Sequence, residues 1–85
     1  MKFQVELSSK AFQALSKLDK INITRILKKL KSLEETPFPV GSLKMEGEEN
    51  VYRLRSGDMR ILYKFLKSEK LILIFKIEKR GKAYD

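Results

Sequence analysis

The apolar residues of this chain change their spacing near residue 50, and that change restricts the possible folds more than any other feature. Between residues 8 and 35 they recur every three or four positions, which is the spacing of amphipathic helices. From Val51 onward, β-branched and aromatic residues come in short runs between turn residues, which is typical of strands. Because 85 residues supply one hydrophobic core and not two, both halves must pack together in a single domain, residues 1–85.

The first half of the chain predicts one strand followed by two helices. Residues 2–7 alternate between apolar and polar side chains, as in a half-buried strand. A first helix should begin after an N-cap at Ser8 or Ser9 and end near Asp19, and the second should carry one apolar stripe with most of its lysines off it. The residues that we expect to face the core from these elements are Phe3, Val5, Leu7, Ala11, Phe12, Leu15, Leu18, Ile23, Ile26, Leu27, Leu30 and Leu33.

Proline and turn residues mark the boundaries in the second half. Pro37 and Pro39 end the helical part, and residues 41–50 should form a polar connection with little order of its own. Three strands follow, which we place near 51–56, 59–66 and 71–78. The predicted fold is therefore α+β, with the order β-α-α-β-β-β: a two-helix hairpin packs on one face of a small, mainly antiparallel sheet and leaves the other face wholly or partly open.

The turn at residues 57–58 determines which side chains share the open face. A two-residue loop there places Arg55 opposite Arg60. It also places Arg53 opposite Leu62, so that the three arginines lie on one side of the sheet. The same register directs five side chains toward the helices and the core: Tyr52, Leu54, Ile61, Tyr63 and Phe65.

The connection before the last strand leaves two registers open. A two-residue turn would put four apolar residues on the arginine face, namely Leu71, Leu73, Phe75 and Ile77. A three-residue loop or a bulge would put them in the core beside Phe65, and we expect this second register. It aligns Lys76, Glu78 and Arg80 with Arg60 and Lys64. The open face would then carry Arg53, Arg55, Arg60, Lys64, Lys76 and Arg80.

The charge of the chain indicates an anionic partner. With 19 Lys and Arg against 11 Asp and Glu, the formal net charge is +8, which attracts nucleic acids or acidic proteins. Arginine occupies the middle of the open face, and its planar guanidinium suits bidentate contacts with phosphate. The simpler alternative is a solvated sheet surface whose cations prevent edge pairing. The lysines of the second helix fit a polar helix face better than an RNA contact.

The chain contains no cysteine and no histidine. Their absence removes the soft and imidazole metal ligands and the commonest nucleophile–base pairs, so we expect no metal and no cofactor. The first ten residues hold no apolar signal core, and no apolar run approaches the ~20 residues of a membrane span. A cytoplasmic protein without a membrane segment is therefore expected.

A family resemblance rests on two segments, VYRLRSGDMRILYKF and LILIFKIEKRGKAY. Together they combine a tyrosine–arginine strand, a Ser-Gly-Asp turn that leads to an arginine, and a last strand that ends in an arginine with a tyrosine four residues later. This combination resembles the core of the RelE/ParE toxin superfamily, and the whole chain follows that family's order of elements. RelE-like members cut messenger RNA in the ribosomal A site and are silenced by a cognate antitoxin, whereas ParE-like members inhibit DNA gyrase.

The resemblance also implies roles for individual residues. The catalytic positions that it implies are Arg53, Arg60, Arg80 and Tyr84. The RNA-binding residues that we expect beside them are Arg55, Lys64, Lys76 and Lys82. Tyr84 would stack on a base or assist proton transfer, although a tyrosine so near a C-terminus is often frayed and inert. Some relatives have a second cation at the position of Val51. Other relatives use a glutamate–histidine pair, which this chain cannot form because it has no histidine. The general base therefore stays unidentified.

The function implied by the resemblance is that of a type II toxin with a RelB-like antitoxin as partner. It would act on the ribosome as a metal-independent endoribonuclease, with the 2′-hydroxyl of the messenger RNA as nucleophile and a 2′,3′-cyclic phosphate and a 5′-hydroxyl as products. Two alternatives remain open: a ParE-like gyrase inhibitor, and a non-catalytic module that binds RNA or an antitoxin.

Overall fold

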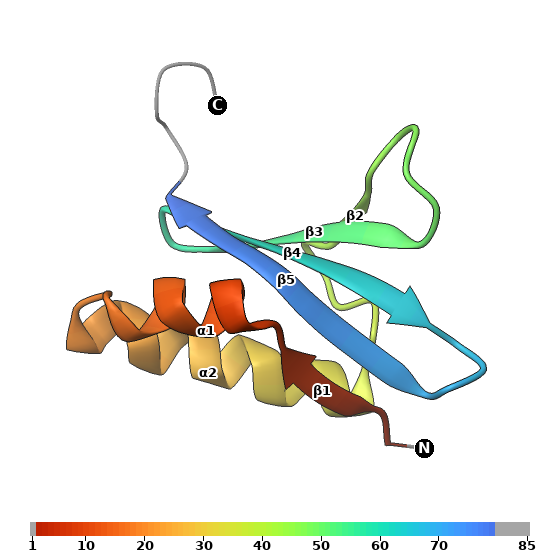
Figure 1. Ribbon diagram of the computed structural model, residues 1–85, viewed down its shortest axis with the longest axis horizontal. Coiled ribbons are helices and arrows are strands. Elements are labelled where there is room, and N and C mark those ends of the chain that lie inside the picture. Colours follow the sequence, from red (N-terminus) through yellow and green to blue (C-terminus); the bar gives the residue numbers. More distant parts are fainter. Residues whose placement is uncertain (1, 80–85) are drawn as a thin grey trace.

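Two helices cover one face of a five-stranded mixed sheet in the computed structural model, which describes residues 2–79 (Figure 1). In chain order the elements are β1 (Gln4–Leu7), α1 (Ser9–Ser16), α2 (Lys20–Glu35), β2 (Leu43–Lys44), β3 (Val51–Ser56), β4 (Met59–Leu66) and β5 (Leu71–Lys79). The strand order across the sheet is β1-β5-β4-β3-β2, with β1 parallel to β5 and the other pairs antiparallel. This architecture confirms the predicted α+β fold.

The helices begin where the sequence indicates, but their apolar faces are narrower than predicted. The hydroxyl of Ser8 caps α1 by accepting a hydrogen bond from the Ala11 amide at 3.1 Å. Phe12 and Leu27 were expected in the core, and that expectation is wrong: they are 61% and 49% exposed. Each directly follows a buried residue, and one step along a helix turns a side chain by about 100°, away from the sheet. The helix residues that do form the core are Ala11, Leu15, Ile26, Leu30 and Leu33.

The β3–β4 hairpin has the predicted register. Arg55 pairs with Arg60 and Arg53 with Leu62 around a two-residue turn at Gly57 and Asp58. Gly57 has a φ of +61°, which a residue without a side chain adopts without strain. The residues expected to face the helices do so, with Leu54, Ile61 and Tyr63 buried and Tyr52 and Phe65 partly buried against them.

The β4–β5 pairing corrects the predicted register of the last strand. Four residues, 67–70, connect Leu66 to Leu71, and an even-numbered loop places Leu71 and Leu73 on the open face. The core positions of this half of β5 are Ile72 and Ile74 instead.

A bulge then restores the predicted arrangement in the second half of β5. Leu62 pairs with Lys76 while its neighbour Tyr63 pairs with Ile74, so Phe75 is the extra residue. Beyond the bulge, Ile77 lies in the core, and Lys76 and Glu78 share a face with Arg60 as expected. The bulge was predicted as a possibility, but it lies inside the strand and not at its start.

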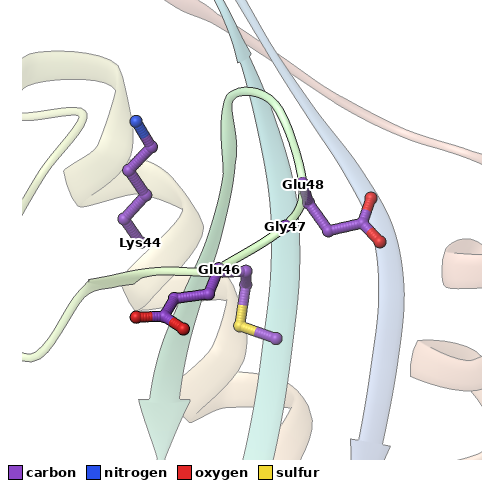
Figure 2. A pocket seen from close by; sticks show the side chains of 5 residues that line it. Lys44, Glu46, Gly47 and Glu48 are labelled. Atoms are coloured by element: carbon purple, nitrogen blue, oxygen red, sulfur yellow. The ribbon is translucent and has the colours of Figure 1, made fainter.

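The connection between α2 and β3 has more order than expected. Leu43 pairs with Arg53 and Lys44 with Tyr52, which adds the short edge strand β2 to the sheet. The loop that follows lines a shallow pocket of about 480 Å³. Figure 2 shows that the carboxylates of Glu46 and Glu48 point in opposite directions, so these two side chains do not converge on one point.

Tyr63 ties the segment after α2 to the middle of the sheet. Its hydroxyl donates a hydrogen bond to the carbonyl oxygen of Pro37 at 2.7 Å. The ring of Phe38 packs nearby against Tyr52 and Phe65, with ring centroids 4.7 and 4.8 Å apart. Burial raises the pKa of Tyr63 from 10.0 to about 12. The phenol therefore stays protonated in the folded protein at pH values where it ionises in the unfolded chain.

We expect Tyr63→Phe to change the dependence of stability on pH. Between pH 10.0 and about 12 the unfolded chain releases the phenolic proton before the folded chain does, so wild-type stability falls as pH rises through this window. The phenylalanine variant should lack this part of the alkaline loss. At neutral pH it should be less stable by about 1 kcal/mol, because the hydrogen bond to Pro37 is missing. Urea unfolding at neutral and alkaline pH measures both effects, and equal alkaline losses in the two proteins would contradict the burial argument.

Candidate nucleic-acid interface

The sheet face turned away from the helices carries the candidate site. Directly paired residues of neighbouring strands project to the same side of a sheet, so the pairings give the layout of this face. The row nearest the β3–β4 turn consists of Arg55, Arg60 and Glu78. The next row consists of Leu43, Arg53, Leu62 and Lys76. Neighbouring rows are about 7 Å apart along the strands. Four of the predicted site residues are therefore together within two rows.

The far end of the same face is mostly apolar. Lys64 lies one row beyond Leu62, between Val51 and Leu73, and Glu6 of β1 follows Leu73 in the same row. Leu66, Leu71 and Gln4 of β1 form the last row, where the correction of the β5 register placed Leu71. The predicted continuous basic face is therefore divided into a basic end near the turn and an apolar end near the β4–β5 loop, with Lys64 between them.

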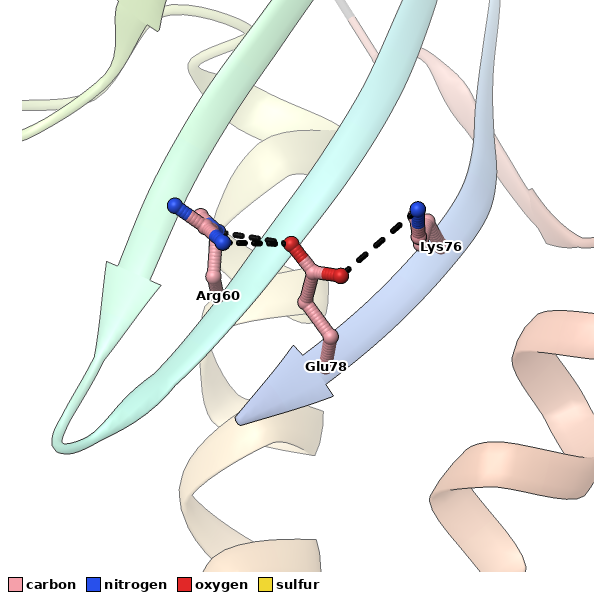
Figure 3. Close-up of polar contacts among 3 residues, drawn as sticks. All are labelled: Arg60, Lys76 and Glu78. Atoms are coloured by element: carbon pink, nitrogen blue, oxygen red, sulfur yellow. Dashed lines mark hydrogen bonds and ion pairs between the residues drawn. The ribbon is translucent and has the colours of Figure 1, made fainter. Parts of the chain in front are cut away.

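Arg60 is held by an acidic residue from the neighbouring strand. Its Nε and Nη2 atoms lie 2.8 and 2.7 Å from the same oxygen, Oε2 of Glu78 (Figure 3). The other oxygen, Oε1, faces Nζ of Lys76 at 3.6 Å. The side chains of Arg60 and Glu78 are 19% and 30% exposed, so solvent screens this pair less than an open surface pair.

Arg53 and Arg55 bring further positive charge to this end of the sheet. Arg55 stands directly opposite Arg60, an arrangement of like charges that opposes folding unless a counter-charge is present. The Nε atom of Arg53 is buried and has no hydrogen-bond partner within residues 2–79. Such an unpaired donor is unfavourable in a folded protein. This end of the sheet therefore concentrates positive charge on the face turned away from the helices, with Glu78 as a counter-charge beside Arg60.

The two rows hold four cations and one carboxylate, Glu78. Guanidinium groups side by side on an open surface can bind the oxygens of one phosphate or of two consecutive phosphates. Glu78 was predicted on this face without a role. Alternation along β5 placed Glu78 on this face, and the two short contacts show that it is paired with Arg60.

Three predicted site residues lie outside the part of the chain that the structure describes. These are Arg80, Lys82 and Tyr84, and their roles stay predictions. β5 ends at Lys79, which pairs with Met59 beside the turn, and Arg80 follows it directly in the sequence.

Within residues 2–79, no group of three His, Cys, Asp or Glu residues is placed to hold a metal ion. The helices α1 and α2, over the same range, are too short or too polar to cross a membrane.

Known proteins share both the sequence pattern and the fold of this chain. The family model described as the ParE toxin of the type II toxin–antitoxin system parDE matches residues 5–84. Toxin RelE1 of Methanocaldococcus jannaschii is 31% identical over 87 residues, which span 99% of this chain and 97% of that protein.

Solved structures give the same result. The toxin fold in the archaeal RelE–RelB complex from Pyrococcus horikoshii OT3 matches with a TM-score of 0.86 and 33% identity, over 98% of this chain and 100% of that one. The isolated RelE toxin of E. coli, at 17% identity, matches in fold alone with a TM-score of 0.84, over 96% and 88% of the two chains. Two helices on a five-stranded mixed sheet are thus the architecture of a RelE toxin. The chain belongs to the RelE/ParE superfamily, as a RelE-family toxin of a type II toxin–antitoxin system.

Proposed function

We propose that this toxin is a ribosome-dependent endoribonuclease that cuts messenger RNA in the A site. The observation that carries the proposal is the clustering of Arg53, Arg55, Arg60 and Lys76 from three strands in two adjacent rows of an open sheet face. The ribosome would hold the messenger RNA in place, and the open sheet face of the toxin would contact it there. The site of action would be the cytoplasm.

The chemistry needs positioning and charge stabilisation more than covalent participation by the protein. The 2′-oxygen of the RNA attacks the adjacent phosphorus, the bond from phosphorus to the 5′-oxygen breaks, and a 2′,3′-cyclic phosphate and a 5′-hydroxyl result. Negative charge builds on the phosphate oxygens in the transition state, where guanidinium groups stabilise it. The proposed catalytic residues are Arg53, Arg60, Arg80 and Tyr84. The proposed RNA-binding residues are Arg55, Lys64, Lys76 and Lys82.

The proposed protein partner is a RelB-like antitoxin. The toxin of the Pyrococcus horikoshii structure was solved in complex with RelB, and it is 33% identical to this chain over almost its full length. A chain with a net charge of +8 should prefer an antitoxin that carries acidic residues near the basic end of the sheet.

A second candidate function is inhibition of DNA gyrase. The family model that matches residues 5–84 is described as a ParE toxin, which favours this alternative. The cluster of arginines favours RNA cleavage, because binding to a protein surface does not need several guanidinium groups placed around one phosphate.

Two assays on the purified toxin distinguish these functions. In one, the toxin is added to translating ribosomes and the ends of the messenger RNA are mapped. In the other, it is added to gyrase and relaxed plasmid. We expect cuts within A-site codons and unchanged supercoiling. Supercoiling inhibition without cuts would support the gyrase alternative, and inactivity in both assays would support a non-catalytic binding module.

A further inference from the structure

We propose that Glu78 is the general base of the cleavage reaction, an inference that rests on the proposed ribonuclease function. The resemblance to known toxins assigned no base to this chain, and the sequence contains no histidine to serve as one. The structure places the Glu78 carboxylate among the cations of the basic end, in the same row as Arg60 and Arg55.

The two carboxylate oxygens of Glu78 have different surroundings (Figure 3). Oε2 accepts a hydrogen bond from Nε of Arg60 at 2.8 Å and forms an ion pair with Nη2 of the same guanidinium at 2.7 Å. Oε1 faces Nζ of Lys76 at 3.6 Å, which is longer than a hydrogen bond. Arg60 therefore fixes the carboxylate through one oxygen, and the other oxygen is left to accept a proton.

The geometry of RNA brings the 2′-hydroxyl within reach of the Glu78 carboxylate. The 2′-hydroxyl is on C2′ and the adjacent phosphorus is attached through O3′ to the neighbouring C3′, so the attacking oxygen lies ~3–3.5 Å from phosphorus in a reactive conformation. A phosphate bound by Arg60 thus brings the 2′-hydroxyl next to the carboxylate that Arg60 holds. A general base must come within ~2.6–3.2 Å of the oxygen that it deprotonates. The 30% exposure of the Glu78 side chain leaves it open to RNA from this face.

Other described carboxylates are less suitable. Asp58, in the β3–β4 turn, is 58% exposed and only loosely paired with Lys79, at 3.9 Å. Glu6 lies on β1 in the row of Leu73, and Glu69 lies in the β4–β5 loop, both toward the apolar end of the sheet. Glu78 is the carboxylate that the paired strands place inside the two cationic rows.

The proposed step balances without a further reactant. Oε1 of Glu78 takes the proton of the 2′-hydroxyl while the 2′-oxygen forms its bond to phosphorus. The bond from phosphorus to the 5′-oxygen breaks, and the leaving oxygen takes a proton from water. Glu78 then returns its proton to solvent, so the enzyme is regenerated.

A purely electrostatic role for Glu78 and a role as general base predict different results for the variant Glu78→Gln. If Glu78 only neutralised Arg60, it would compete with the phosphate, and removing its charge would strengthen RNA binding without slowing the reaction. A base role predicts that Glu78→Gln binds as well as wild type or better, but reacts slowly. General bases typically contribute about 10²–10⁴-fold in rate.

The test is single-turnover cleavage of ribosome-bound messenger RNA at saturating toxin, measured across pH for wild type and Glu78→Gln. We expect the variant to be slower by about 10²–10⁴-fold and to lose the rise in rate with pH that a carboxylate base produces. The matched control is Asp58→Asn, which removes a negative charge at the same end of the sheet and should cut at close to the wild-type rate. Thermal unfolding shows whether each variant is folded.

If Glu78→Gln does not fold, Glu78→Asp decides, because it keeps the carboxylate and shortens its reach. This variant should be slower than wild type and keep the acidic limb of the pH profile, whereas wild-type speed would overturn the base role. The base role alone is overturned if wild type cuts and folded Glu78→Gln cuts at least as fast with the same pH dependence. If wild type does not cut on the ribosome, the proposed function fails, and the base role fails with it.

Discussion

Replacing Arg60 by alanine is expected to slow messenger RNA cleavage on the ribosome by about 10²–10³-fold, because the transition state loses a well-placed cation. Arg60 stands in the row nearest the β3–β4 turn, opposite Arg55 and bonded to Glu78. Its removal also leaves the partly buried carboxylate without its strongest partner. A loss of stability of about 1–3 kcal/mol should therefore accompany the loss of rate.

The measurement pairs single-turnover cleavage with thermal unfolding, at a temperature where the variant is fully folded. Arg25→Ala is the matched control, because Arg25 lies on α2 and is the one arginine of the sequence with no predicted role in the site. We expect it to cut like wild type. If the folded Arg60→Ala protein also cuts at nearly the wild-type rate, Arg60 does not stabilise the transition state.

Replacing Ile26 by alanine should have the opposite consequence, with a large loss of stability and little change in chemistry. Ile26 is completely buried between α2 and the sheet, far from the open face. Truncating a buried isoleucine destabilises a protein by about 2–5 kcal/mol, through lost burial and the cavity that remains. Urea unfolding measures the loss, and cleavage is compared under conditions in which both proteins are folded.

The same helix supplies the control for this prediction. Ile21 is 62% exposed, so Ile21→Ala should change stability by no more than about 0.5 kcal/mol. Similar losses in the two variants would mean that the core does not lie on the side of α2 that faces the sheet.

The sequence predicted the β3–β4 hairpin correctly because two independent features agreed. Alternation assigned Arg53 and Arg55 to one face, and the Gly57-Asp58 turn fixed their partners on β4. The last strand was harder, because residues 71–75 are apolar without interruption and alternation carries no information there. The four-residue loop before β5 and the bulge inside it determine which β5 side chains face the core and which face the open side. Neither feature has a clear sequence signature.

The remaining differences come from packing rather than from local pattern. Phe12 and Leu27 have the right residue type for a core, but the sheet contacts a narrower stripe of each helix than the sequence indicates. β2 is only Leu43–Lys44, and its pairing depends on β3 being in place, so local preference alone does not reveal it.

The alternation of side chains along the strands predicted which residues share the candidate site, but not the contacts between them. The alternation of side chains along the strands and the length of the β3–β4 turn predicted that Arg53, Arg55, Arg60 and Lys76 share one face. The strand pairings confirm this prediction. Both Arg60 contacts reach the same oxygen of Glu78, and this depends on side-chain conformations across two strands, which residue order does not specify.

The most direct test of the proposed function is end-group analysis of messenger RNA after the purified toxin has acted on ribosomes with a defined codon in the A site. We predict a cut within that codon, with a 2′,3′-cyclic phosphate on the upstream fragment and a 5′-hydroxyl on the downstream fragment. Intact messenger RNA, or fragments that carry a 5′-phosphate and a free 3′-hydroxyl, would contradict cleavage by attack of the 2′-hydroxyl.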